Sequence, residues 1–143
     1  MKGKVEWIGI RSERKAPVTS KNAVNVNIES GIEGDHPANA NRQVTIISKE
    51  YLEDVSASLG IGTIDPHATR RNILISGLEF DNLENATIRL GSVLLEITGP
   101  CRPCIRMDEN LGEGGRRAME GKGGWTTRVL ESGDIKVGDD ASV

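Results

Sequence analysis

A pair of cysteines separated by two residues is the part of the sequence best suited to chemistry. Cys101 and Cys104 lie in the run TGPCRPCIR, residues 98–106, which contains two prolines and follows an apolar stretch. Because proline cannot donate a hydrogen bond to a β ladder, we expect both cysteines on a loop at the end of a strand. The thiolate is the reactive and metal-binding form of cysteine, and neighbouring cations favour it. Arg102 and Arg106 flank Cys104, so Cys104 is predicted to be the reactive thiol.

Three other interpretations of the cysteines stay open. Free cysteines are often small buried hydrophobic residues without a chemical role. A C-x2-C pair is half of a tetrahedral zinc site, and in this chain the other two ligands would have to be His36 and His67. A thioredoxin-like redox pair would open a helix after a strand, whereas Pro103 precedes Cys104 in β-rich surroundings. Two cysteines in a chain without an export signal favour free thiols over a structural disulfide.

Basic residues stand at the start of two apolar runs. Arg70, Arg71 and Asn72 lead into one run, and Arg42 leads into another. Guanidinium groups hold phosphate or carboxylate through two parallel hydrogen bonds, so these residues suit an anionic ligand. A solvated charge pair is the alternative for the adjacent arginines. The acids of the turn at residues 31–36 are expected to cap backbone N–H groups or to pair with Arg42.

Short apolar runs, several of them alternating with polar residues, predict a series of strands. The predicted strands cover residues 5–10, 23–28, 43–47, 72–75, 87–90, 93–97, 125–130 and 135–137. Gly91 and Ser92 predict a tight hairpin between the strands on either side of them. The turn at 132–134 predicts a second hairpin, which pairs 125–130 with 135–137.

One helix is clearly indicated. Ser48 is placed to cap its start, Leu52, Val55 and Leu59 recur at helical spacing, and Gly60 ends it. A further one or two helical turns are predicted at residues 115–120. The glycine-rich segment 110–124 that contains them is expected to be either a mobile loop over a site or a plain surface loop.

These elements predict a mostly β fold, a closed or nearly closed β-barrel with one or two short helices. An open sheet made of such short strands would leave exposed edges, so closure is favoured. We expect one domain over residues 1–143, because the length is that of an ordinary domain and the sequence has no internal repeat or linker.

Composition narrows the choice of partners. The formal net charge of −3 argues against a nucleic-acid-binding face, which needs clustered Lys and Arg. No apolar run approaches the roughly 20 residues of a membrane span, so no membrane association is expected. The N-terminal residues do not follow the pattern of a signal peptide, and we therefore expect a cytoplasmic protein.

Several short motifs, taken in their order along the chain, resemble the MOSC domain, the family of the molybdenum cofactor sulfurase C-terminal domain. The motifs are GIEGD at 31–35, RQVT at 42–45, RNI at 71–73, LG at 90–91, PC at 103–104, GG at 123–124, RVL at 128–130, Gly133 and VGD at 137–139. The resemblance covers nearly the whole chain and rests on the joint order and spacing of these motifs.

The resemblance implies a mostly β barrel that binds the pterin-based molybdenum cofactor. By position, Cys104 matches the family cysteine that handles sulfur or ligates molybdenum. Arg71 and Asn72 match the family's Arg-Asn pair and are implied to contact the phosphate or the pterin, with Arg42 and Arg70 as further cofactor-binding candidates. The family is also associated with pyridoxal phosphate binding.

Three functions are compatible with the resemblance, and they leave open whether the chain is an enzyme. In the preferred one, the chain binds the cofactor or carries sulfur during cofactor maturation or delivery, and its partner is a sulfur donor. In the second, it is a small molybdoenzyme that reduces N-hydroxylated bases or amidoximes with electrons from a separate donor protein. In the third, it is a binding module that kept the fold and lost the cofactor. Asp35 is given a structural role, and Cys101 that of a thiol that resolves a sulfurated Cys104 through a reversible disulfide.

Overall fold

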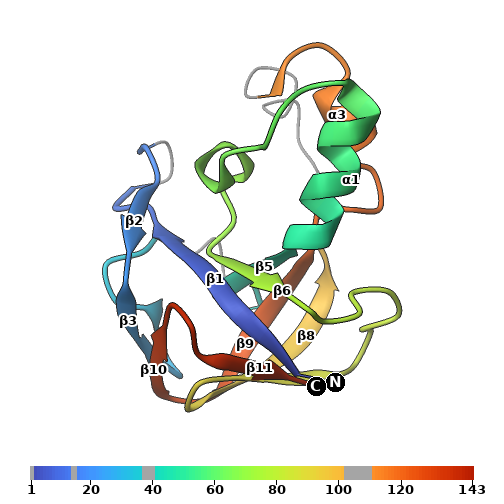
Figure 1. Ribbon diagram of the computed structural model, residues 1–143. Helices are drawn as coiled ribbons and strands as arrows, with labels where there is room; N and C mark the ends of the chain where they lie inside the picture. The colour runs from blue at the N-terminus through green and yellow to red at the C-terminus, as the bar shows by residue number, and fades with distance from the viewer. Residues whose placement is uncertain (1, 14–15, 37–40, 102–110) are drawn as a thin grey trace.

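A closed barrel of seven strands forms the body of the protein in the part of the chain that the structure describes. The structure, a computed structural model, describes residues 2–13, 16–36, 41–101 and 111–143. Around the barrel the order is β11, β7, β8, β9, β5, β6 and β1, and β1 pairs back with β11 to close it (Figure 1). The barrel strands are β1 (Lys2–Ile10), β5 (Val44–Ser48), β6 (Ile73–Ser76), β7 (Thr87–Leu90), β8 (Val93–Pro100), β9 (Trp125–Glu131) and β11 (Asp140–Ser142). The predicted mostly β barrel is confirmed.

The remaining strands lie along one side of the barrel. β2 (Thr19–Lys21) extends the sheet beyond β1, and a separate three-stranded sheet has the order β10 (Gly133–Lys136), β3 (Ala23–Asn27) and β4 (Gly31–Ile32). The alternation predicted for β3 is confirmed, because Val24 and Val26 are buried while the residues between and beside them are exposed. Every strand pair within the described residues is antiparallel apart from β5 with β6.

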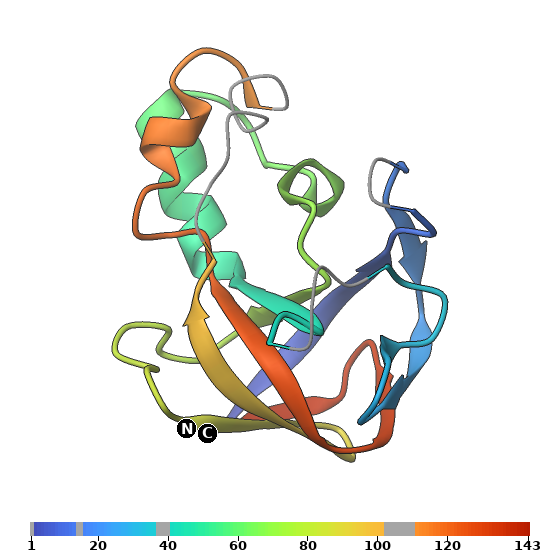
Figure 2. The ribbon, with the colours of Figure 1, turned by 180° about the vertical axis from the view of Figure 1, so that it is seen from behind.

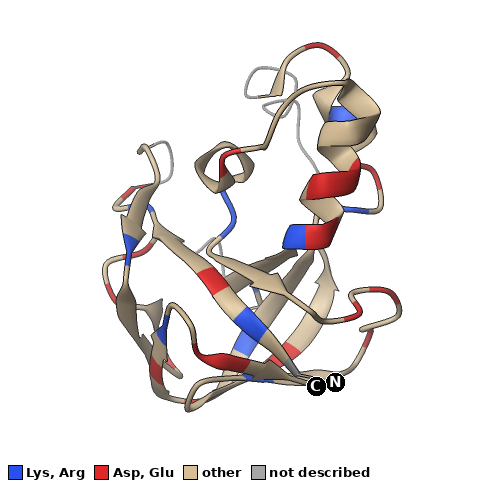
Figure 3. Ribbon diagram, viewed as in Figure 1, with Lys and Arg blue, Asp and Glu red and all other residues tan. Residues whose placement is uncertain are grey.

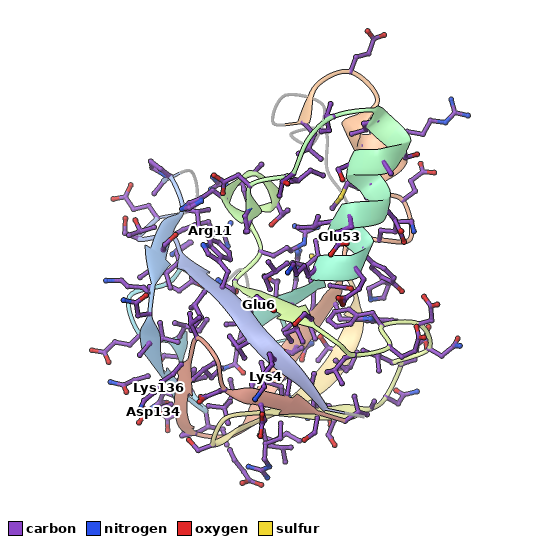
Figure 4. All side chains as sticks on the ribbon, viewed as in Figure 1. Lys4, Glu6, Arg11, Glu53, Asp134 and Lys136 are labelled. Carbon is purple, nitrogen blue, oxygen red and sulfur yellow. The ribbon has the colours of Figure 1, made fainter. Side chains whose placement is uncertain are left out.

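The barrel interior is filled by aliphatic side chains. On β1, Val5 and Ile8 point into this core, while Lys4 and Glu6 lie on the outer surface of the same strand (Figure 4). A register shift between Val5 and Trp7 lets two buried residues lie three positions apart without breaking the pairing with β6. The core includes Ile46, Ile73, Ile75, Phe80, Ile88, Leu90, Leu95, Ile135 and Ala141.

The parallel pair β5 and β6 is buried on both faces, because Ile47 and Leu74 on its outer face pack against helix α1 (Lys49–Leu59). The predicted caps are confirmed: the Ser48 hydroxyl accepts a hydrogen bond from the Tyr51 N–H at 3.2 Å, and Gly60 ends the helix with φ of 66°. Ile46 faces the barrel interior and Ile47 faces the helix. The two clusters meet across a single strand, so α1 is fixed relative to the barrel.

A second short helix, α3 (Gly115–Ala118), packs on α1, and the two helices stand together beyond one end of the barrel (Figure 1). Met119 follows α3 and is fully buried with Leu52 and Val55 of α1. The helical turn predicted within residues 115–120 is therefore confirmed, and Met119 holds this part of the glycine-rich segment against α1.

One strand pairing predicted from the sequence is wrong. Residues 125–130 and 135–137 were expected to form a hairpin, but β9 pairs with β8 on one side and β5 on the other. Figure 2 shows β9 lying beside β8 along its length. Both edges of β9 are therefore occupied, and β10 pairs instead with β3, Ile135 lying opposite Val24.

Charged residues of both signs are mixed over the surface of the barrel and along α1 (Figure 3). Of the helices in the described residues, none has the length and apolar character needed to cross a membrane.

Candidate functional site

The candidate site lies where β8 ends, at the end of the barrel nearest the helices. Cys101 directly follows β8, and its backbone N–H donates to the carbonyl oxygen of Gly124 at 2.9 Å. Its side chain is a free thiol, and the residue is only 2% exposed. Cys104, with its neighbours Arg102 and Arg106, lies outside the described residues. The position of Cys101 at a strand end agrees with the expectation from the flanking prolines.

Two adjacent glycines, Gly123 and Gly124, allow close contact between their backbone and the backbone of neighbouring strands beside Cys101. A Cβ atom on Gly123 would lie 2.0 Å from the carbonyl oxygen of Cys101, and one on Gly124 would lie 1.9 Å from that of Ile46. Gly124 also has φ of 84°, in the left-handed region that favours glycine. Only glycine fits at these two positions, so the pair brings β5, β8 and β9 together around the thiol.

Arg71 holds this glycine turn from the other side. Its guanidinium donates from Nε to the carbonyl oxygen of Gly123 at 2.8 Å and from Nη1 to that of Thr69 at 3.2 Å. The residue is only 7% exposed. Thr69 ends the short 3-10 helix η1 (Pro66–Thr69), so Arg71 joins η1 to the turn that contacts Cys101.

Asn72 is also buried, and its side chain bonds to neighbouring strands. Its Oδ1 accepts from the Thr45 N–H at 3.0 Å and from the Thr45 hydroxyl at 3.2 Å, and its Nδ2 donates to the Gly9 carbonyl at 3.0 Å. These bonds join β1, β5 and the start of β6. Asn72 therefore holds β1 and β5 next to the start of β6, beside Arg71.

Among the described residues, Arg42 is an exposed cation that lies next to the buried thiol. Its Nη2 lies 3.7 Å from the Cys101 Sγ, within reach of an N–H to sulfur hydrogen bond. Arg42 also borders an open, mainly polar cavity of about 520 Å³. The cavity is lined by Asn41, Arg42, Asn85, Glu96, Ile97, Thr98 and Thr126. An anionic ligand in this cavity would meet the Arg42 guanidinium, hydroxyl and amide groups, and the Glu96 carboxylate, whose charge is offset by its hydrogen bond from Arg128 at 2.7 Å.

A second cavity, of about 300 Å³, reaches Cys101 from the side of α1. Its lining includes the aromatic residues Tyr51, Phe80 and Trp125 and acidic residues such as Asp81. Burial, together with the hydrogen bond that the Tyr51 hydroxyl donates to Asp81, raises the pKa of Tyr51 above its ordinary value of 10.0. The phenol, which is protonated at neutral pH, therefore ties Asp81 to helix α1.

The other predicted residues lie in separate parts of this end of the molecule. The side chain of Arg70 bonds to a different segment from that of Arg71: its Nη2 donates to the carbonyl oxygen of Ala16 at 2.8 Å. Asp35 accepts a hydrogen bond from the backbone N–H of Arg11 at 2.8 Å, which agrees with the expectation that the acids of this turn cap backbone groups. The adjacent arginines thus hold two different segments.

The described residues contain no group of three or more His, Cys, Asp and Glu side chains that could hold a metal ion. His67, one of the two histidines considered for a zinc site, is hydrogen-bonded to Asp65 and Ser20.

The sequence alone did not identify two features of this site. The contact between Gly123 and Cys101 joins residues 22 positions apart, and the GG motif was its only signal. The aromatic cavity joins a helix, a loop and a strand, and the single Tyr, single Phe and two Trp of the chain gave no pattern that predicted it.

The fold and the site define a mixed β-barrel with a buried thiol and basic side chains at one end. The family model for the MOSC domain matches residues 33–142, and the chain belongs to this family. The family is associated with the molybdenum cofactor. A comparison with curated proteins finds no match.

Solved structures share the fold. The YuaD protein from Bacillus subtilis superposes with a TM-score of 0.85 at 20% identity, over 99% of this chain and 94% of that one. YiiM from Geobacillus stearothermophilus gives a TM-score of 0.77 at 18% identity, over 96% of this chain and 72% of that one. YiiM from Escherichia coli gives 0.74 at 17% identity, over 97% and 68% respectively.

The described residues fit a phosphate-bearing, metal-containing cofactor in part. The exposed guanidinium of Arg42 suits a phosphate, and the polar cavity beside it suits a ring edge rich in hydrogen-bonding groups. The Cys101 thiol is a soft donor of the kind that soft metals prefer, but it is buried and lines the second cavity rather than the polar one. Arg71 and Asn72 bond to backbone carbonyls of the chain, and these bonds fix the glycine turn and the strands next to the site.

Proposed function

We propose that this protein binds the molybdenum cofactor at the end of the barrel that carries Cys101 and Arg42, and that it acts in cofactor maturation or delivery. The observation that carries the proposal is the Arg42 guanidinium, which lies 3.7 Å from a buried thiol and borders a polar cavity. A cation and a polar cavity are features that the phosphate and the pterin would use, and the thiol beside them marks the strand end from which the chain runs on to Cys104.

The residues take different roles in this proposal. Arg42 contacts the phosphate, because its side chain is exposed and borders the cavity. Arg71 and Asn72 act as positioning residues, and Arg70 steadies the segment near Ala16. Cys104 holds sulfur or ligates molybdenum, which rests on its match to the family cysteine and on the flanking arginines. When bound, the cofactor supplies a redox-active metal that a thiolate can ligate.

A fluorescence titration tests the proposal. Purified protein is titrated anaerobically with molybdenum cofactor, and binding is followed by pterin fluorescence. We expect Arg42→Met to weaken binding by about 10- to 100-fold, the effect of losing one charge-assisted hydrogen bond of about 1.5–3 kcal/mol. Lys136→Met, on β10, is the matched control and should bind as wild type does. Equal affinities for the two variants would contradict the role of Arg42.

Cys104→Ser tests the thiol separately. If Cys104 ligates molybdenum, X-ray absorption of the loaded variant should show one sulfur neighbour fewer than wild type. If Cys104 instead carries sulfur, the wild type should accept a cyanolysable sulfur atom from a persulfide donor and the variant should not. A variant that matches wild type in both measurements would exclude both roles.

The aromatic cavity favours a second candidate function, the reduction of N-hydroxylated bases or amidoximes. Tyr51 offers a partly exposed aromatic ring for a planar base, and Asp81 offers a carboxylate for the amidine-like edge of that base. Turnover of such a base by the loaded protein with a flavin or iron–sulfur donor protein, and its loss in Asp81→Asn, would support this function over delivery.

A further inference from the structure

A second set of reactive side chains lies on η1 and β2 and shares no residue with the cofactor site. The Ser20 hydroxyl lies 2.8 Å from Nε2 of His67, and Nδ1 of the same imidazole lies 2.6 Å from Oδ1 of Asp65. Hydroxyl, imidazole and carboxylate thus form a hydrogen-bonded series. As in serine hydrolases, the hydroxyl bonds to Nε2 of the imidazole and the carboxylate bonds to Nδ1. Figure 1 shows β2 and the helical turn of η1 on the same end of the barrel as α1.

Local structure fixes the orientation of the imidazole. Asp65 caps η1, and its Oδ1 accepts both from the backbone N–H of His67 at 2.9 Å and from Nδ1. These hydrogen bonds lower the pKa of Asp65, so it is ionised at neutral pH and can only accept. The proton of the neutral ring therefore lies on Nδ1, and Nε2 is left to accept from Ser20.

The serine is held from the other side by Trp7. The indole Nε1–H donates to the Ser20 hydroxyl at 2.9 Å, and the Trp7 ring meets the His67 ring edge to face, with centroids 5.2 Å apart. Ser20 lies opposite Gly9 in the pairing of β2 with β1. With one hydrogen bond donated and one accepted, the Ser20 oxygen keeps a lone pair for attack.

We propose that Ser20 is a nucleophile, with His67 as its general base and Asp65 as the group that orients the base, and that it takes up acyl groups from small activated esters. The Ser20 oxygen forms a bond to the ester carbonyl carbon, and the bond from that carbon to the leaving oxygen breaks. The serine proton passes to Nε2 of His67 and then to the leaving alcohol. Water, activated by the same imidazole, hydrolyses the acyl-serine to the free acid and restores the hydroxyl.

Exposure defines the class of substrate. The side chain of His67 is 42% exposed and that of Asp65 is 70% exposed. Water screens the charges at such a site, so the barrier is lowered less than in a buried triad. The substrates must therefore supply a good leaving group, because the N–H donor that Trp7 places at the site is bonded to the serine oxygen itself.

Covalent labelling with a fluorophosphonate tests the proposal on the whole protein. The probe forms an oxygen–phosphorus bond with an activated serine and releases fluoride, and peptide mapping identifies the serine. We expect Ser20 to be labelled ahead of Ser132, an exposed serine whose hydroxyl accepts from the Ile28 N–H. His67→Gln should slow labelling by about 100-fold, the lower end of the range for general-base catalysis. His36→Gln removes the only other histidine and should leave labelling unchanged.

Hydrolysis of p-nitrophenyl acetate gives the second readout. Ser20→Ala is expected to lose the activity. The rate of hydrolysis by Asp65→Asn should lie between that of His67→Gln and that of wild type. Labelling of Ser20 in the wild type no faster than that of Ser132 would overturn the proposal without any variant. Equal labelling of His67→Gln and His36→Gln would also overturn it. Because the cofactor is not needed for either readout, these results are independent of the proposed cofactor function.

Discussion

At the scale of single residues, the position of the Cys101 thiol depends on a close backbone contact. The carbonyl of Cys101 faces the bare Cα of Gly123, and the carbonyl of Gly123 in turn accepts from Arg71. Arg71 is therefore important to the site even though its guanidinium bonds to backbone carbonyls. These contacts give Arg71 a supporting role, because they hold the glycine turn on which Cys101 rests.

Gly123→Ala should disturb this contact directly. The added Cβ would lie 2.0 Å from the Cys101 carbonyl oxygen, so β8 or the turn has to move, and we expect a loss of about 1–3 kcal/mol in the free energy of unfolding. Gly62→Ala is the control, since its Cβ meets nothing within 4 Å. Urea unfolding of both variants measures the difference. Similar stabilities for the two would show that the glycine turn tolerates a side chain.

Tyr51 predicts how stability changes at alkaline pH. Burial and the hydrogen bond to Asp81 raise the pKa of Tyr51 in the folded protein above 10.0. The unfolded chain loses the tyrosine proton first, so the contribution of Tyr51 is complete below pH 10 and declines as the pH rises above it. Tyr51 is the only tyrosine, so its ionisation can be followed by absorbance without interference from another phenol. Tyr51→Phe should lose stability less steeply above pH 10; an unchanged slope would contradict this assignment.

Local residue roles could be predicted from the sequence, and long-range ones could not. Ser48 and Gly60 cap α1 as predicted, because capping depends on neighbours within a few positions. The contacts of Arg71 depend on Gly123, 52 positions away. Sequence chemistry indicates that a guanidinium will bind oxygen atoms, but only the fold decides whether these belong to a ligand or to the backbone.

At the scale of elements, the β5–α1–β6 unit links the barrel to the helices. Apolar runs without alternation predicted two strands here, and burial on both faces explains their composition. The pairing of β10 was predicted wrongly because a turn signal indicates a hairpin without showing which strand edges are free. The edges of β9 are taken by β8 and β5.

Met119 tests whether α3 is a fixed element. The side chain is fully buried between the helices, so Met119→Ala should lower the free energy of unfolding by about 2–5 kcal/mol. Hydrogen exchange should also become faster in the N–H groups of residues 118–120 and 122, which bond within this segment. Glu120→Ala, an exposed neighbour, should change neither quantity. Equal exchange in both variants would mean that the segment is not held by its buried methionine.

At the scale of the whole molecule, the barrel is closed by strands from the two ends of the described chain. β1 pairs with β11, Lys2 lying opposite Ser142, and the Val5 N–H donates to the Asp139 carbonyl at 2.9 Å. Without this closure, β1 and β11 would each leave an edge with unpaired N–H and C=O groups. Barrel closure could be predicted from strand number and length, but the identity of the closing pair could not, since β11 has only three residues.

Ala141→Asp should therefore destabilise the entire barrel. Ala141 is fully buried on β11, and an unpaired carboxylate there should cost about 3–5 kcal/mol. Val143→Asp places the same charge on an exposed residue two positions later and should have little effect. Thermal unfolding followed by circular dichroism compares the two, and a similar melting temperature for both would contradict the closure by β11.

The proposed cofactor function belongs to this same scale, because the site is assembled from the ends of several strands. Anaerobic gel filtration of wild-type protein with equimolar molybdenum cofactor, followed by molybdenum and pterin analysis of the protein peak, tests it most directly. The proposal predicts about one molybdenum and one pterin per chain, for a complex tight enough to survive the column. A protein peak with neither would contradict cofactor binding, and would leave the MOSC fold of this chain without the ligand of its family.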